Sequence, residues 1–279
     1  MFKKKKDQTY QSYWSISWNI FKKNKVAMVC LFIVILLCLI ALFAPLIAPY
    51  DPNKQVLTDR LMKPCGQHWF GTDDLGRDIF SRIIYGCRVS LSVGIISQII
   101  ATVIGYTMGV CAGYYGGKVD SVISFLIQVF SSFPFLLFAM AIMFVLGPGL
   151  INLYLALGLL GWASTARLIR GDVMRLKKME YIDACKVSGG NSFRIIMKHL
   201  LPNCLSTLIV TVTLGIPNAI MSEASLSFLG LGVKAPMASW GSMISFSQPY
   251  IRSATYYSVI PGLAIIITVL AFNMLGDGL

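Results

Sequence analysis

The sequence predicts an all-α membrane protein that crosses the bilayer six times and keeps both termini in the cytoplasm. Its 279 residues have a mean hydropathy of +0.70 and only 13% of them are charged, unlike a soluble domain. Uncharged apolar runs are long enough to cross a bilayer. We expect the spans at residues 26–47, 91–112, 122–146, 150–166, 204–229 and 257–275.

The placement of the basic residues sets the orientation. The net charge is +12, which by itself is also compatible with nucleic-acid binding. With the N-terminus inside, however, 16 of the 24 basic residues lie on the cytoplasmic side, as the positive-inside rule predicts. We therefore expect the protein to lie in a lipid bilayer and to have no nucleic-acid partner. We also expect the loop at 167–203 to be cytoplasmic.

The first 25 residues combine a lysine run with three aromatic residues, Trp14, Trp18 and Phe21. Their spacing places the rings on one face of a helix at the lipid headgroups. A signal peptide is the competing interpretation, but the basic lead is too long and the run from Val26 is of spanning length, without a small-residue cleavage site. The chain divides into a cytoplasmic interfacial segment (1–25), a first transmembrane helix (26–47), an extracytoplasmic segment (48–88) and a core of five transmembrane helices (89–279).

The extracytoplasmic segment contains one expected helix. Thr72 or Asp73 is positioned to cap this helix. Its apolar residues form a stripe on the side opposite to Asp78, Ser81 and Arg82. The stripe consists of Ile79, Phe80, Ile83 and Ile84. We expect this amphipathic helix to lie along the outer face of the membrane, where a substrate-delivering protein would land. A solvated loop that only connects two spans is the alternative.

Three spans carry residues of special interest. Gly94, Gly105 and Gly109 in the second span permit close helix packing. In the third, Ser131, Ser132 and Pro134 predict a proline kink whose freed backbone groups are satisfied by hydroxyls.

The fifth span holds one carboxylate, Glu223. An ionisable group in a span indicates a functional or packing role. Ser227 lies four residues later on the same helix face, within hydrogen-bond reach, and Asn218 lies five residues earlier. Pathway lining and interhelical hydrogen bonding remain the two interpretations, and in the first Glu223→Gln should impair uptake.

The sequence predicts no nucleotide, cofactor or metal site in this chain. The run Gly116-Gly117-Lys118 is not a phosphate loop, because Ala112 and Val119 occupy positions that require glycine and a hydroxyl residue. The two histidines are expected on opposite sides of the membrane, which excludes a histidine-based metal centre. We expect the seven cysteines to be mainly buried free thiols that pack like small hydrophobic side chains. Only Cys65 and Cys87 share the outer side, so a disulfide between them remains open.

A polar stretch at 180–203 interrupts the apolar chain. Its first helix carries Tyr181, Ala184, Cys185 and Ser188 at three- and four-residue spacing, so that one side is small enough for a partner to approach closely. Glycines 189 and 190 end this helix. Ser192 is expected to cap a second helix, and Pro202 marks the start of the next element.

This stretch resembles the cytoplasmic coupling loop, the EAA loop, of permease subunits of bacterial ABC importers. The loop follows the pattern E-A-A, three residues, G, nine residues, I, one residue, L-P. Residues 183–185 fall on E-A-A, Gly189 on G, and Leu201-Pro202 on L-P. Asp183, Cys185 and His199 depart from the usual glutamate, alanine and isoleucine. Two further blocks, at 71–78 and 223–243, resemble the C-type permease of dipeptide, oligopeptide and nickel importers.

The resemblance implies a type I ABC importer permease fold (MetI-like). It implies a non-catalytic integral subunit of the bacterial cell membrane that forms half of the pathway for di- and oligopeptides. The implied partners are a second homologous permease, two ATPase subunits that hold ATP and Mg, and an extracytoplasmic substrate-binding protein. The helix at 180–188 would sit in an ATPase groove and act as a lever.

The same resemblance assigns residues to roles. The implied coupling residues are Glu180, Tyr181, Asp183, Ala184, Cys185, Ser188, Gly189, Gly190, Leu201 and Pro202. The candidate docking residues are Gly71, Thr72, Asp73, Gly76, Arg77 and Asp78, and the candidate pathway or packing residues are Glu223, Asn218 and Ser227.

Three alternatives remain. The same fold could carry nickel or a metal chelate. A self-sufficient secondary transporter or channel would show several intramembrane charges or an inverted repeat. A membrane-embedded enzyme would need clustered polar residues within the spans.

Overall fold

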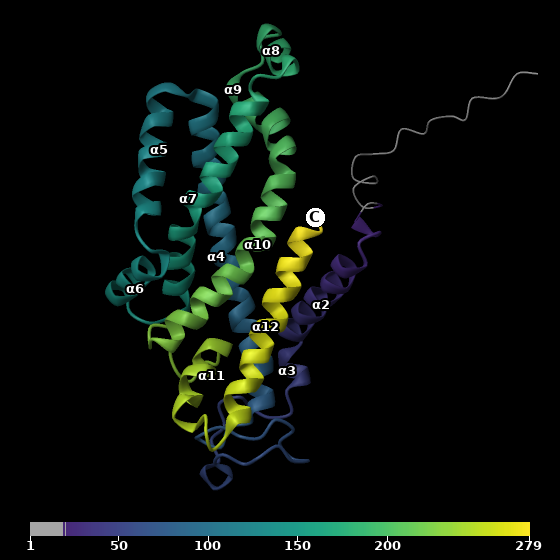
Figure 1. Ribbon diagram of the computed structural model, residues 1–279, viewed down its shortest axis with the longest axis vertical. Helices are drawn as coiled ribbons and strands as arrows, with labels where there is room; N and C mark the ends of the chain where they lie inside the picture. The colour runs from purple at the N-terminus through teal and green to yellow at the C-terminus, as the bar shows by residue number, and fades with distance from the viewer. Residues whose placement is uncertain (1–18, 20) are drawn as a thin grey trace, which may run out of the picture.

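The computed structural model describes residues 19 and 21–279, which form an elongated bundle of helices (Figure 1). The long helices run along its longest axis. The short helix α8 (Glu180–Val187) lies at one end of the bundle, and residues 48–78 lie at the opposite end. The predicted aromatic face of Trp14 and Trp18 falls outside the described residues, whereas Phe21 is buried in a cluster with Ala27 and Leu275.

Four helical runs of the described residues are long and apolar enough to cross a membrane. They are α2 (Lys25–Leu42), α4 (Ile79–Tyr115), the run Ser192–Phe228 that includes α10 (Leu201–Phe228), and α12 (Thr255–Asp277). The sequence predicted six spans, and the remaining two take a different form.

The expected third span is broken. Helices α5 (Gly117–Ser132) and α6 (Phe135–Leu146) meet at 89° and make a fifth crossing only if the pair is one span. The backbone of Phe133 is extended, with φ −92° and ψ 139°, because a residue before proline avoids the helical conformation. The predicted proline kink at Pro134 is therefore a break between two helices.

Helix α7 (Leu150–Leu176) contains the expected fourth span but is not among the strongly apolar helices. It packs against α4 along much of its length. A Cβ added at Gly105 would lie 2.6 Å from Cβ of Thr165, and one added at Gly109 would lie 2.7 Å from the Ala166 carbonyl oxygen. These glycines permit the close approach that the sequence predicted. The face of α7 that packs on α4 is therefore buried, whereas Ser164, Arg167 and Arg175 stay exposed.

The expected amphipathic helix at the outer end is the beginning of α4. Asp78 caps it, since its Oδ2 accepts the Ser81 backbone N–H at 2.7 Å. The predicted caps Thr72 and Asp73 are wrong because Asp73 is engaged in a turn, where its Oδ1 accepts the Leu75 and Arg77 backbone N–H groups at 2.9 Å. The helix continues without interruption into the second span.

Short elements complete the end of the bundle that holds residues 48–78. They are α3 (Ala44–Ile47), η1 (Leu57–Asp59), α11 (Trp240–Ser247) and η3 (Gln248–Tyr250). Trp240 is fully buried and packs with Cys87, Leu91 and Ile220. Cys87 is a free buried thiol in α4, and Cys65 is a free exposed thiol. The disulfide alternative therefore does not hold, because α4 directs Cys87 into the bundle.

Candidate functional site

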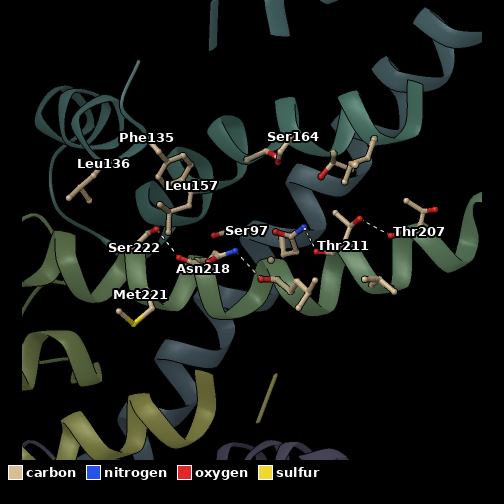
Figure 2. A pocket seen from close by; sticks show the side chains of 18 of the residues that line it. Ser97, Phe135, Leu136, Leu157, Ser164, Thr207, Thr211, Asn218, Met221 and Ser222 are labelled. Carbon is tan, nitrogen blue, oxygen red and sulfur yellow. Dashed lines mark hydrogen bonds between the residues drawn. The ribbon is translucent and has the colours of Figure 1, made fainter. Parts of the chain in front are cut away.

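A groove with a volume of ≈ 1010 Å³ lies between α4, α6, α7 and α10 (Figure 2). Helix α10 contributes most of its lining, at three- and four-residue steps that define one helix face. Its polar lining residues are Ser206, Thr207, Thr211, Asn218, Ser222 and Ser225. The groove is therefore built mainly on the hydroxyl face of one long helix.

The opposite wall comes from α4 and α7, with Phe135 and Leu136 of α6 at one side. Ser97 and Gln98 belong to α4, and Ser164 and Thr165 belong to α7. The Gln98 Nε2 donates to Thr102 Oγ1 at 3.3 Å and to the Thr211 carbonyl oxygen at 3.5 Å. No lining residue of the described chain is Asp, Glu, Lys or Arg. The groove is uncharged, and its hydroxyl and amide groups are set among a larger apolar surface.

Asn218 is the predicted pathway candidate that lines this groove. The other lining residues, including Ser97, Gln98 and Thr211, were missed. The recurrence of hydroxyl residues on α10 at helical spacing was a usable signal for half of the site. The α4 and α7 residues carry no such signal, because only tertiary packing brings their helices against α10.

Glu223 is fully buried and lies outside the groove lining. Its Oε1 accepts the hydroxyl of Ser227 at 2.6 Å and the hydroxyl of Ser239 at 2.7 Å. Ser239 also caps α11, because its Oγ accepts the Ser242 backbone N–H at 3.1 Å. The carboxylate thus joins α10 to the start of α11, which is the geometry of the interhelical interpretation and not of pathway lining.

The predicted docking residues form a buried polar network. Asp73 Oδ2 contacts Arg77 Nε at 2.5 Å and Arg82 Nε at 3.4 Å. Asp78 Oδ1 lies 2.8 Å from His68 Nδ1. All of these side chains are buried. These side chains are therefore turned toward their partners and away from solvent, and docking at this segment stays a prediction.

The remaining residues of this motif also have structural roles. Thr72 is fully buried, and its Oγ1 accepts the Met62 backbone N–H at 2.8 Å. Gly71 and Gly76 have φ values of +78° and +72°, which favour glycine. A Cβ at Gly71 would lie 2.7 Å from the ring of Tyr256 on α12. The motif fastens residues 48–78 to α4 and α12.

At the opposite end, α8 is anchored through one side. Ile182 is fully buried in a cluster with Val173 and Leu200. The predicted coupling residues Glu180, Tyr181, Asp183, Ala184 and Ser188 are exposed, and Cys185 is half-buried. Apolar side chains accompany them, with Val187 89% exposed and Phe193 73% exposed. The free side of α8 is therefore open and partly apolar.

The end of α8 follows the prediction. Gly189 has φ +80°, and the Gly190 backbone N–H donates to the Cys185 carbonyl oxygen at 2.9 Å, as at many helix ends closed by glycine. The next cap differs, because Asn191 and not Ser192 accepts the Arg194 backbone N–H, at 2.8 Å.

Helix α9 (Ser192–Ile195) and the π-helical η2 (Ile196–Leu200) lead into α10. Leu201 and Pro202 are the first two residues of α10. They do not open a separate helix, because Ser192–Phe228 is one continuous helical run and the Leu201 backbone N–H donates to the Ile196 carbonyl oxygen of the π-helical turn. The predicted new element at Pro202 is therefore a change of helix type within one run.

Polar contacts connect the α8 end to the groove. Lys177 Nζ donates to the Tyr114 carbonyl oxygen at 2.6 Å. Thr207, which lines the groove, donates its hydroxyl to Asp172 Oδ2 at 2.5 Å. Asp172 is close in sequence to the start of α8. A displacement of α8 and the end of α7 would thus reach a lining residue through one hydrogen bond.

Comparisons with known proteins agree on the class. Residues 102–279 match the family described as "Binding-protein-dependent transport system inner membrane component". Residues 12–64 match "N-terminal TM domain of oligopeptide transport permease C". A chain of the inward-facing MetNI methionine ABC transporter aligns with a TM-score of 0.58 and 19% identity, covering 71% of this chain and 94% of that one. This likeness confirms the predicted type I permease fold.

Relatives from several bacteria align over nearly the whole chain. The dipeptide transport system permease protein DppC of Bacillus subtilis is 45% identical over 269 residues, which cover 96% of this chain and 84% of that protein. The oligopeptide transport system permease protein OppC of the same organism is 40% identical over 96% and 88% of the two chains. The glutathione transport system permease protein GsiD of Pectobacterium atrosepticum is 40% identical over 98% and 91%.

Proposed function

Because the chain belongs to the family of binding-protein-dependent transport system inner membrane components, we propose that it forms half of the pathway by which an ABC importer carries di- and oligopeptides into the cell. The observation that carries this proposal is the uncharged groove between α4, α6, α7 and α10, in which hydroxyl and amide groups are set among apolar side chains. Hydroxyl and amide groups there can replace water around a peptide backbone without holding it tightly.

The cargo follows from the relatives and not from the groove alone. The three relatives above are named for dipeptide, oligopeptide and glutathione transport. This favours peptides over nickel or a metal chelate. Family membership also argues against the alternatives of a secondary transporter, a channel and an enzyme.

The α8 end is proposed to face the cytoplasm. Exposed basic residues surround it, among them Lys178, Lys186 and Arg194, as expected for a cytoplasmic end. At the other end, Arg77 and Arg82 are buried and paired with Asp73. In this orientation α7 and the broken α5–α6 pair complete six crossings, and both termini are cytoplasmic in a multi-pass protein of the bacterial cell membrane.

Helix α8 is proposed to contact an ATP-binding cassette subunit. Its open side is small at Ala184 and apolar at Val187, which suits insertion into a groove of a partner. ATP and Mg would be held by two such partner subunits, and this chain would pair with a second homologous permease. ATPase closure would then move α8 and, through Asp172 and Thr207, the wall of the groove.

A substrate-binding protein is proposed to dock at the end formed by residues 48–78. Since the motif at 71–78 is buried, exposed apolar side chains on the same segment are the better contact candidates. Leu57 and Trp69 are the most exposed of these. The buried network would give the segment a fixed shape on which such contacts are presented.

The coupling proposal is tested with Ala184→Arg in the assembled transporter, reconstituted with ATP. Ala184 is exposed, so the long charged side chain should leave this chain folded and block its approach to the ATPase. We expect peptide uptake to fall at least about tenfold, since an unmatched charge at an interface costs about 1.4 kcal/mol or more.

The matched control is Val119→Arg, at an exposed position in the first turn of α5, outside both α8 and the proposed docking segment. It places the same side chain away from the proposed ATPase contact and should leave uptake within about twofold of the unaltered transporter, a difference of under 0.5 kcal/mol. Normal uptake by the assembled Ala184→Arg transporter would contradict the coupling role of α8.

A further inference from the structure

The hydroxyl groups on the α10 wall of the groove donate their hydrogens to their own helix. Thr211 Oγ1 donates to the Thr207 carbonyl oxygen at 2.7 Å. Ser222 Oγ donates to the Asn218 carbonyl oxygen at 2.7 Å, and Ser225 Oγ donates to that of Met221 at 2.9 Å. A hydroxyl has one hydrogen and two lone pairs. Once the hydrogen is used within the helix, lone pairs remain for the groove.

Asn218, Ser164 and Gln98 follow the same pattern. Asn218 Nδ2 donates to the Leu214 carbonyl oxygen at 3.0 Å, and Ser164 Oγ donates to that of Gly161 at 3.0 Å. Gln98 directs its amide nitrogen to two acceptors inside the protein. Figure 2 shows the bonds that join Asn218, Thr211 and their neighbours along α10. On the side chains with these internal bonds, the groups left over are mainly oxygen acceptors, with one N–H of Asn218 in addition.

Ser97 stands apart from this pattern. Its side chain is only 2% exposed and lines the groove, and its Oγ has no hydrogen-bond partner among the described residues. Figure 2 shows Ser97 on the α4 wall, facing the part of α10 that carries Asn218 and Ser222. A buried polar group without a partner is costly. The Ser97 hydroxyl is therefore an unsatisfied polar group at the α4 wall of the groove.

The charged group nearest to the groove wall in these contacts is negative, which also favours a donor-rich cargo. Among the described residues, no lining side chain carries a charge of either sign, so the wall itself attracts neither an anion nor a cation by full charge. Behind the wall, the carboxylate of Asp172 accepts the Thr207 hydroxyl. The distance from Asp172 Oδ1 to Arg175 is 3.4 Å, longer than the bond from Thr207. The Arg175 side chain is largely exposed, so solvent weakens this ion pair and little of the negative charge of Asp172 is neutralised.

We propose that this groove is an acceptor-lined selectivity surface that favours cargo carrying N–H donors, above all a protonated amine, over cargo rich in carboxylates. The N–H donors of a cargo can meet these lone pairs one after another along α10, first at Thr211 and further along the helix at Ser222 and Ser225, whereas a carboxylate offers only further lone pairs. The inference rests on the proposed peptide-import function and deepens it by naming the residues that would set cargo preference.

The test compares two dipeptides of opposite character, lysyl-lysine and glutamyl-glutamate. Uptake is measured in proteoliposomes that contain the assembled transporter and ATP, with both dipeptides at concentrations that saturate the binding protein. The quantity compared is the ratio of the two turnover rates, because it reports passage and not loading. Thr211→Val replaces a lining hydroxyl by a methyl group of nearly the same shape.

Thr213→Val is the matched control. Thr213 lies on the same helix, its Oγ1 donates to the Ile209 carbonyl oxygen at 2.8 Å, and it is not part of the groove lining. We expect Thr211→Val to lower the ratio of lysyl-lysine to glutamyl-glutamate turnover by about three- to tenfold, the effect of losing an acceptor for a charged donor. Thr213→Val should leave the ratio unchanged.

Ser222→Ala provides a second, smaller change at the groove in case Thr211→Val does not assemble, and it should shift the ratio in the same direction. A ratio that neither groove variant changes, or that Thr213→Val changes equally, would overturn the inference while the transporter still imports peptides. If the unaltered transporter imports neither dipeptide, the proposed function itself is wrong. The two failures are thus distinguishable.

Discussion

Replacing Glu223 separates a packing role from a transport role. The carboxylate is fully buried, and its Oε1 accepts two hydroxyls at 2.6 and 2.7 Å. Its Oε2 is buried and has no partner among the described residues. Glutamine keeps a carbonyl oxygen for both hydroxyls and places its amide nitrogen at the buried Oε2 position, beside the Ser90 hydroxyl, which can accept an N–H. We therefore expect Glu223→Gln to retain both stability and uptake.

Glu223→Ala should behave differently, because it leaves the buried hydroxyls of Ser227 and Ser239 without their acceptor. Each such loss costs about 1–2 kcal/mol, so the free energy of unfolding should fall by about 2–4 kcal/mol. For a chain of this size that corresponds to a drop of roughly 5–15 °C in the unfolding midpoint. Ser239→Ala removes one of the two bonds and should show about half of the effect.

The assay measures the unfolding midpoint of the purified transporter complex in detergent and, in parallel, ATP-driven dipeptide uptake. The reasoning would be refuted if Glu223→Gln abolished uptake while its midpoint stayed unchanged. That result would return Glu223 to the pathway, since a purely structural carboxylate cannot affect transport without affecting the fold.

Three further predictions concern packing, the buried network and a helix cap. Gly109→Val should destabilise the α4–α7 contact by about 1–3 kcal/mol in thermal unfolding, whereas Gly171→Val, where a Cβ meets open space, should cost clearly less. Asp73→Asn should leave buried arginines unpaired, cost about 3–5 kcal/mol and make residues 48–78 cleavable in limited proteolysis. Asn191→Ala should cost about 1 kcal/mol through loss of the cap, visible as faster hydrogen exchange at Arg194.

Failure of these three would be informative in each case. Equal midpoints for the two glycine variants would contradict the close α4–α7 approach. Unchanged protection of residues 48–78 against protease in Asp73→Asn would show that the buried ion pairs do not hold that segment. Unchanged exchange at Arg194 would remove the assigned cap.

The sequence by itself determined the class of the protein and the local structure of its polar segments. Long apolar runs require helices in a bilayer, so the membrane class followed from composition alone. The end of α8 was also predictable, because Gly189 and Gly190 act through backbone conformation that depends on neighbouring residues only. The motifs at 71–78 and 183–202 identified the family that the comparisons then confirmed.

Only the tertiary structure decided which polar residues face a cavity and which are buried. Charged residues such as Asp73 and Arg77 are usually exposed, and only their pairing with each other and with Arg82 explains their burial. The acceptor for Ser239 is Glu223, sixteen residues away, and the partners of α10 across the groove lie on α4 and α7. Such contacts join residues far apart in the chain, and local spacing carries no record of them.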